Sequence, residues 1–181
     1  HNHKGKDPHI WLNPLYAIKM TENITEALIK KDPKHKTFYE ANKKDYIRQL
    51  KDLDQSFEKM FQTCKHKHII YGGHFAFGHF AKRYSLTHSS PYKGFSPNAQ
   101  PTPQSVIDLI RTIKKQKQNV IYFEELIDPK VAKIIAEETN AKLMLLHGVH
   151  NISKEDKQHG KTYLSIMKEN LEKLKIGLEC Q

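Results

Sequence analysis

The chain has 181 residues and a formal net charge of +10, from 30 lysines and arginines against 20 aspartates and glutamates, and 38% of its residues are hydrophobic. This composition predicts a globular protein with a real core, in one domain or in one domain plus part of another. No apolar run reaches the roughly 18 residues of a membrane-spanning helix, and the first residues lack the apolar stretch of a signal peptide. The lysines alternate with acidic residues instead of clustering with aromatic ones, so no nucleic-acid partner is predicted.

Two helices are predicted before residue 64. Asn13 as N-cap and Pro14 at the first helical position begin the first helix. Asp32 and Pro33 begin the second, whose apolar residues step mostly by three and four as far as Phe61, which indicates a long amphipathic helix. The first helix carries an apolar stripe made of Leu15, Ile18, Ile24 and Leu28.

From residue 67 onward, short apolar runs alternate with amphipathic stretches. The predicted strands are 67–71, 86–90, 119–123 and 142–146. Helices are predicted at 75–84, 103–116 and 129–138, and a last one from 153 to about 175. Alternation of this kind builds βαβ units with right-handed crossovers. The sequence therefore predicts an α/β fold with a four-stranded parallel sheet flanked by helices and preceded by a long helix.

Side chains able to bind metal follow three of the four predicted strands. His74 follows strand 67–71 after a Gly-Gly turn, Glu124 and Glu125 follow strand 119–123, and His147 follows strand 142–146. In open α/β sheets, ligands bind outside the carboxyl ends of the strands. Imidazole nitrogens and carboxylate oxygens are the usual ligands of Zn²⁺, so this pattern predicts a zinc-type site.

We predict His9, His74 and His147 as the metal ligands. Glu124 and Glu125 are predicted to be additional ligands or hydrogen-bond acceptors behind a histidine. Each histidine also has a purely structural interpretation: His74 as a helix cap, His9 as a packed turn residue, and His147 as a strand-end turn residue. Four further histidines have other assignments: His79 and His150 lie close enough to compete as ligands, and His1 and His3 are predicted to collect metal loosely.

The two cysteines, Cys64 and Cys180, have no CxxC spacing. A disulfide and two free thiols both remain open from the sequence. No nucleophile elbow and no HExxH segment is present, and no catalytic residue is predicted.

Five segments resemble, in order, the zinc- and manganese-specific substrate-binding proteins of ABC importers, the ZnuA/TroA-like family. DPHIWLNP at 7–14 is similar to its DPHxWLDP segment, and HFAFGHFAKRY at 74–84 is similar to its HDAFGYFAKRY segment. The other three are GFSPNAQPT at 94–102, FEELIDPKVA at 123–132 and YLSIMKENL at 163–171.

The resemblance implies two α/β lobes joined by a long helix, with the metal held between them. His9 and His74 match the family's second and third histidine ligands, and the position of its acidic ligand falls on His147. A histidine there makes the site richer in nitrogen, which favours Zn²⁺ over Mn²⁺. The family's aspartate after the third histidine is replaced here by Phe75.

The resemblance also implies that this sequence is the back half of a longer protein. Residues 1–31 then belong to the first lobe, 32–64 to the connecting helix and 65–181 to the C-terminal metal-binding lobe. The apolar stripe of the first helix, left uncovered, is expected to favour self-association.

The implied function is the capture of Zn²⁺ outside the cytoplasm, in the periplasm or on a lipid anchor at the cell surface, and its delivery to the membrane permease of an ABC importer. This role involves no catalysis. The alternatives are a manganese-specific binding protein and a zinc hydrolase that holds its metal with three protein ligands and a water molecule.

Overall fold

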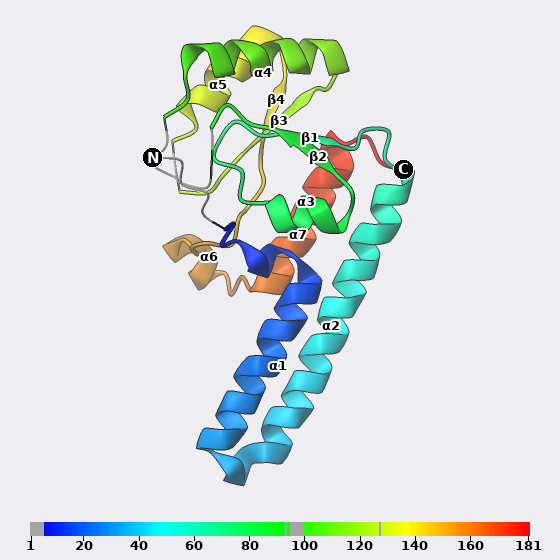
Figure 1. Cartoon of the computed structure of the whole chain (residues 1–181), viewed down its shortest axis with the longest axis vertical. Coiled ribbons are helices and arrows are strands. Elements are labelled where there is room, and N and C mark those ends of the chain that lie inside the picture. Colours follow the sequence, from blue (N-terminus) through cyan, green and yellow to red (C-terminus); the bar gives the residue numbers. More distant parts are fainter. Residues whose placement is uncertain (1–5, 93, 95–99, 127) are drawn as a thin grey trace.

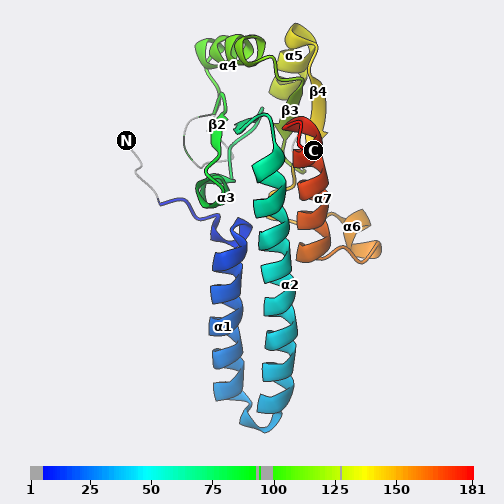
Figure 2. The same cartoon turned by 90° about the vertical axis from the view of Figure 1, so that its right-hand side faces the viewer.

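The computed structural model describes residues 6–92, 94, 100–126 and 128–181. His1, His3 and most of segment 94–102 lie outside the described residues. Helices α1 (Pro14–Lys31) and α2 (Lys36–Thr63) are joined by a short 3-10 turn, η2 (Pro33–His35), and form an antiparallel hairpin (Figures 1 and 2). As predicted, Pro14 is the first residue of α1, and the Asn13 side chain accepts a hydrogen bond from the Leu15 N–H at 3.0 Å.

The described strands are β1 (His68–Ile70), β2 (Thr87–Ser89), β3 (Val120–Phe123) and β4 (Lys142–Leu145). β1 pairs with β2 and β3 pairs with β4, both in parallel. A single parallel bridge between Tyr71 and Tyr122 joins the pairs, and the Gly72 N–H donates to the Tyr122 carbonyl at 2.7 Å. The order is therefore β2-β1-β3-β4, which confirms the predicted four parallel strands.

The sheet is less continuous than predicted, because β1 and β3 meet only at their carboxyl ends. Near the start of β1, the His68 carbonyl accepts a hydrogen bond from the Gln118 side-chain amide at 2.7 Å. The His68 carbonyl is therefore already bonded and does not accept a backbone N–H from β3. The backbone pairing of β1 with β3 is limited to the Tyr71–Tyr122 bridge.

Two apolar clusters cover the two faces of the strands. Ile121 packs with residues of α4 (Pro103–Gln116) and α5 (Lys130–Thr139), whereas its neighbours Val120 and Tyr122 belong to the other cluster. This alternation follows from the two-residue period of a strand. The second cluster includes residues from α2, from α3 (Gly78–Arg83) and from α7 (Tyr163–Gly177), and Figure 2 shows α2 and α7 running side by side.

The prediction of one helix over 153–175 was wrong. Two helices are present, α6 (Lys154–Gln158) and α7. Gly160 between them has a φ of 66°, which a continuous right-handed helix excludes. Thr162 then starts α7 with a capping box to Ser165. The predicted start at residue 153 is confirmed, since Ser153 is the N-cap of α6 and its side chain accepts from the Asp156 N–H at 3.0 Å.

Cys64, at the end of α2, forms a disulfide with Cys180, which follows α7. The backbone supports this link, because the Lys65 N–H donates to Glu179 and the His66 N–H donates to Leu178. The disulfide thus encloses every described strand within one covalent loop.

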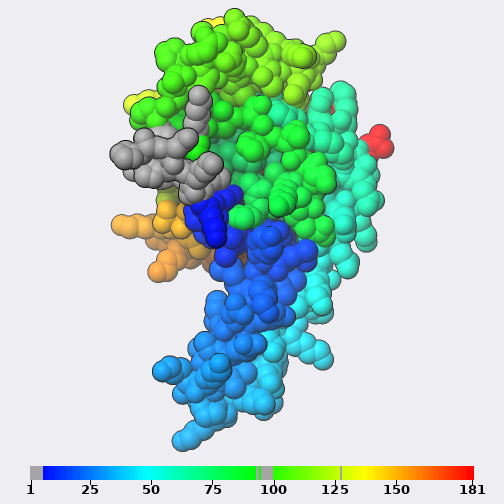
Figure 3. Space-filling view, in the orientation of Figure 1, coloured from blue at the N-terminus to red at the C-terminus, as the bar shows by residue number. Residues whose placement is uncertain are grey.

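The hairpin of α1 and α2 projects from the α/β part as an arm (Figure 3). Three residues of its predicted apolar stripe, Leu15, Ile24 and Leu28, are exposed. None of the described helices is long and apolar enough to cross a membrane.

Asp54 of α2 holds α3 in place. It is buried and accepts three hydrogen bonds, from Arg83 Nε at 3.1 Å, Arg83 Nη2 at 2.8 Å and the Tyr84 hydroxyl at 2.8 Å. Asp54→Asn removes the buried charge and leaves the Arg83 guanidinium only the longer contact with Glu58, whose Oε1 lies 3.5 Å from Arg83 Nη2. We expect a loss of about 2–3 kcal/mol in the free energy of unfolding, measured by urea titration.

Asp52→Asn is the matched control, two residues away on the same helix. Asp52 meets Arg48 at 3.4 Å in an exposed ion pair, so this substitution is expected to leave the free energy of unfolding nearly unchanged. Equal effects of the two substitutions would show that the buried network does not contribute to stability.

Candidate metal site

Three imidazoles converge where the N-terminal segment meets the carboxyl ends of the strands. One ligand atom from each of His9, His74 and His150 lies within 4.8 Å of the others. His9 Nε2 and His74 Nε2 are 3.4 Å apart. Two nitrogens bound to one tetrahedral zinc ion at about 2.0–2.1 Å are separated by about 3.4 Å. This pair already has the spacing of two zinc ligands.

Each imidazole comes from a different part of the chain. His9 precedes the 3-10 turn η1 (Ile10–Leu12), His74 follows β1, and His150 follows β4. β1 and β3 are adjacent although they are not consecutive, and ligand sites in open α/β sheets form at such a change of strand order. The order of the strands therefore accounts for the location of the site.

The same arrangement of hydrogen bonds holds His9 and His74. Asp7 Oδ1 lies 2.6 Å from His9 Nδ1 and accepts the His9 backbone N–H at 3.0 Å. Glu124 Oε2 lies 2.7 Å from His74 Nδ1, and its Oε1 accepts the His74 backbone N–H at 3.1 Å. One carboxylate thus fixes both the backbone and the ring of each histidine.

Glu125 contacts the backbone and the ring of His150 in the same way. Its Oε1 lies 3.2 Å from both the backbone nitrogen and Nδ1 of His150, and its Oε2 accepts the Gly148 N–H at 2.8 Å. Burial alone would raise the pKa of Glu125, but the hydrogen bonds from His150 and Gly148 outweigh it and hold this pKa at about 2. Glu125 is therefore a carboxylate at neutral pH.

This set of contacts determines which nitrogens are available to a metal. Carboxylates behind Nδ1 favour the tautomer with its proton on Nδ1, which leaves a lone pair on Nε2. Burial is the main cause that lowers the pKa of His9, so its ring is neutral at pH 7. His150 Nε2 is buried and has no hydrogen-bond partner among the described residues. Convergent imidazole lone pairs of this kind fit a zinc-type cation.

Two glycines leave room for this arrangement. A Cβ on Gly148 would lie 2.5 Å from Cε1 and Nδ1 of His150, and a Cβ on Gly73 would lie 2.7 Å from Glu124 Oε1. Both distances are shorter than any real Cβ contact. Larger residues here would displace an imidazole or the carboxylate behind it.

Trp11 connects the His9 segment to the loop that carries His150. Its Nε1 donates to the Gly148 carbonyl at 2.9 Å, and its own carbonyl accepts from the Tyr163 hydroxyl at 2.8 Å. The Trp11 ring centroid lies 5.4 Å from that of His9 and 5.6 Å from that of His150. The chain's single tryptophan is thus a natural fluorescent reporter of the site.

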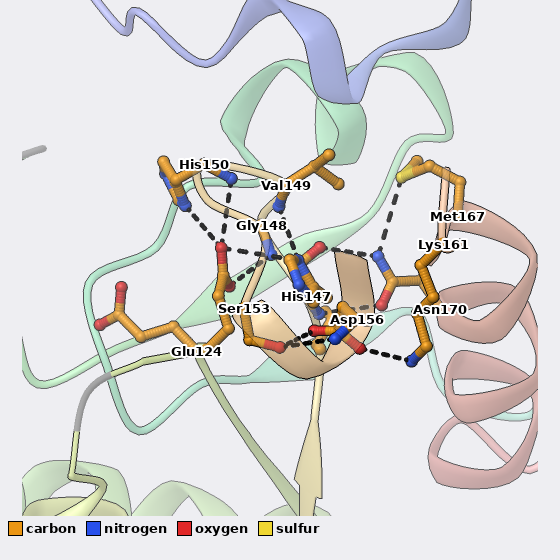
Figure 4. Close-up of polar contacts among 12 residues, drawn as sticks. Glu124, His147, Gly148, Val149, His150, Ser153, Asp156, Lys161, Met167 and Asn170 are labelled. Carbon is orange, nitrogen blue, oxygen red and sulfur yellow. Dashed lines mark hydrogen bonds and ion pairs between the residues drawn. The ribbon is translucent and has the colours of Figure 1, made fainter. Parts of the chain in front are cut away.

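The structure brings together two of the three predicted ligands and places His147 outside the group. His147 is buried, and its Nδ1 accepts the Val149 N–H at 2.9 Å (Figure 4). His150, considered only as a competitor in sequence, is the third member of the group. His79 does not belong to it either, and its Nε2 lies 3.0 Å from the Asp7 carbonyl.

Sequence analysis missed the role of Asp7. The signal for it was present, because an aspartate two residues before a histidine can accept that residue's backbone N–H in an Asx turn. Glu124 and Glu125, for which a ligand role and a supporting role were both open, each lie behind an imidazole.

Comparisons with protein families and with individual proteins find the same kind of relative, a zinc-uptake or zinc-binding protein. The family described as "Zinc-uptake complex component A periplasmic" matches residues 1–177. The high-affinity zinc uptake system protein ZnuA of Bacillus subtilis is 41% identical over 172 residues, which cover 95% of this chain and 53% of that protein. The zinc-binding protein AdcA of Streptococcus pyogenes is 35% identical over 176 residues, which cover 97% of this chain and 34% of that protein.

Solved structures show the same fold. The metal-dependent lipoprotein YcdH from Bacillus subtilis superposes with a TM-score of 0.83 at 39% identity, over 98% of this chain and 66% of that one. The Zn(II)-bound ZnuA-like domain of Streptococcus pneumoniae AdcA gives a TM-score of 0.79 at 33% identity, over 96% of this chain and 64% of that one.

The chain thus spans about half of the Bacillus subtilis protein and about a third of the streptococcal one. The family match covers nearly its whole length and includes every residue of the histidine cluster. On this basis, the chain belongs to the ZnuA family of zinc-uptake components.

Proposed function

We propose that this chain binds Zn²⁺ through His9, His74 and His150 and serves as part of an extracytoplasmic zinc-binding component of an ABC importer. The observation that carries the proposal is the convergence of three imidazoles, each with a carboxylate behind its Nδ1. Three nitrogen ligands leave one position of a tetrahedral ion for water or another ligand.

The names of the relatives support zinc as the cargo. The Bacillus subtilis relative is a zinc uptake system protein, and the AdcA structure contains Zn(II). A set of three imidazoles also favours Zn²⁺ over Mn²⁺, which prefers oxygen ligands. Delivery to a membrane permease, and a periplasmic or lipid-anchored location, belong to this proposal together with the division into 1–31, 32–64 and 65–181. So does self-association through the exposed stripe of α1.

The geometry favours capture over hydrolysis. A zinc hydrolase needs a carboxylate or another base free to take a proton from the metal-bound water. Asp7, Glu124 and Glu125 are each occupied by hydrogen bonds from a histidine's ring and backbone. Carboxylates held in this way orient ligands and do not act as a general base.

A calorimetric titration of the chelator-treated chain with Zn²⁺ and then Mn²⁺ tests the proposal. We expect one Zn²⁺ per chain and weaker Mn²⁺ binding. His150→Ala should lower the zinc affinity by at least about tenfold, because it removes one of three nitrogens.

His159→Ala is the control for this experiment. His159 is exposed, and its Nδ1 bonds only to the backbone carbonyl of Glu155 among the contacts described. Its substitution should not change the affinity. If each chain bound several zinc ions weakly, and both variants bound them equally well, surface histidines would be the metal ligands and the proposed site would not.

A further inference from the structure

The turn between His147 and His150 contains a strained residue. Val149 has a φ of 55°. A β-branched side chain is a clear outlier at positive φ, and such a residue persists only where its surroundings impose it. The strain lies one residue before His150, so it affects the direction from which that imidazole enters the site.

Side chains accept all three consecutive backbone N–H groups of this turn. Glu125 accepts those of Gly148 and His150 at 2.8 and 3.2 Å. The N–H between them, that of Val149, donates to His147 Nδ1 at 2.9 Å. His147 therefore accepts the hydrogen bond from the backbone of the strained residue, as Figure 4 shows.

His147 is itself firmly held. Its N–H donates to Asn170 Oδ1 at 2.9 Å, and its carbonyl accepts from Asn170 Nδ2 at 2.8 Å. Asn170 lies in α7 and is 1% exposed. The hydrogen bonds from α7 fix His147, and its ring then fixes the turn that follows.

We propose that His147 is a positioning residue for zinc binding, whose Nδ1 holds Val149 at positive φ so that the His150 imidazole faces His9 and His74. This inference rests on the proposed function. Neither ring nitrogen of His147 belongs to the group formed by His9, His74 and His150. As a ligand through Nδ1, His147 would have to release the Val149 N–H and leave the turn unsupported.

Three variants separate positioning from ligation, with zinc affinity measured by competition against a chelator and by Trp11 fluorescence. His147→Ala removes the acceptor and is expected to lower the affinity by about 10–100-fold, as for other residues that orient metal ligands. His147→Asn should restore it to within about threefold of the wild type, because an asparagine oxygen accepts the N–H two residues on in an Asx turn.

The third variant is His147→Ala combined with Val149→Gly. Glycine adopts positive φ without support, so the double variant should recover at least about tenfold of the lost affinity. Circular dichroism and thermal unfolding establish that each variant is folded. His147→Asn and the double variant keep the test decisive if His147→Ala alone does not fold.

Several results would overturn the inference. One is an affinity of His147→Asn as low as that of His147→Ala, with no recovery on adding Val149→Gly, which is the behaviour of a metal ligand. Another is unchanged affinity in His147→Ala with only a lower melting temperature, which is the behaviour of a structural residue. If the wild type binds no zinc, or if His150→Ala has no effect, the proposed function fails and the inference fails with it.

Discussion

Replacing His74 with alanine is expected to lower the zinc affinity of this chain by about two orders of magnitude or more. Structural zinc sites with four ligands bind with about 10–16 kcal/mol, or roughly 3 kcal/mol per ligand. His74 is 3% exposed, and its Nε2 lies 3.4 Å from that of His9. Its loss also leaves Glu124 without the ring that it orients. A competition titration with a chromogenic chelator measures the change in affinity.

His79→Ala is the control, five residues further along. His79 Nε2 lies 3.0 Å from the Asp7 carbonyl and 3.9 Å from Asp7 Oδ2, and its ring is not part of the group formed by His9, His74 and His150. Its loss should therefore change the affinity by less than about threefold. Thermal unfolding gives an independent measurement. Zinc at about 100 times its Kd should stabilise the wild type by about 2.7 kcal/mol and His74→Ala hardly at all. If His79→Ala lowered the zinc affinity more than His74→Ala, the metal site would include His79 and not His74.

The four strands and the general location of the site could be predicted from the sequence, because both follow from short-range patterns. The run from His68 to Ile70 and the Gly72–Gly73 turn indicate a strand that ends at a ligand-binding edge. His74 then lies at that edge whatever the details of packing. Predictions of this kind depend on the alternation of elements, which is visible within about ten residues.

The grouping of His150, and not His147, with His9 and His74 could not be predicted in this way. It depends on the positive φ of Val149, and valine favours extended conformations in sequence-based rules. The Val149 N–H bonds to His147, but the groups that hold the rest of this turn and His147 itself are Glu125 and Asn170, both more than twenty residues away. No local signal carries that information.

The break between α6 and α7 was missed for a different reason. Its signal, Gly160 between polar residues, is present in the sequence. The amphipathic pattern of the flanking residues outweighed it, although glycine inside a helical pattern also marks a helix end. The structure places Gly160 at positive φ and Thr162 as the new N-cap, so a capping box was the better guide to the boundary.

The pairing of the cysteines was equally inaccessible to sequence, since Cys64 and Cys180 are 116 residues apart. That separation gives the disulfide a large expected effect. Closing a loop of about 100 residues removes entropy from the unfolded chain worth about 4.7 kcal/mol in the chain-entropy model. Cys64→Ser combined with Cys180→Ser should therefore lower the free energy of unfolding by about 4–5 kcal/mol in a urea titration.

The zinc affinity is the control measurement for the disulfide variant. The disulfide joins the end of α2 to the segment after α7, next to the C-terminus marked in Figure 1. None of the contacts described joins either cysteine to His9, His74 or His150. The double serine variant, studied below its unfolding temperature, should keep the zinc affinity of the wild type within about threefold. A reductant should destabilise the wild type to the level of the variant and leave the variant unchanged. A loss below about 1 kcal/mol would mean that the unfolded chain already keeps these two segments together, because the disulfide acts by restricting that state.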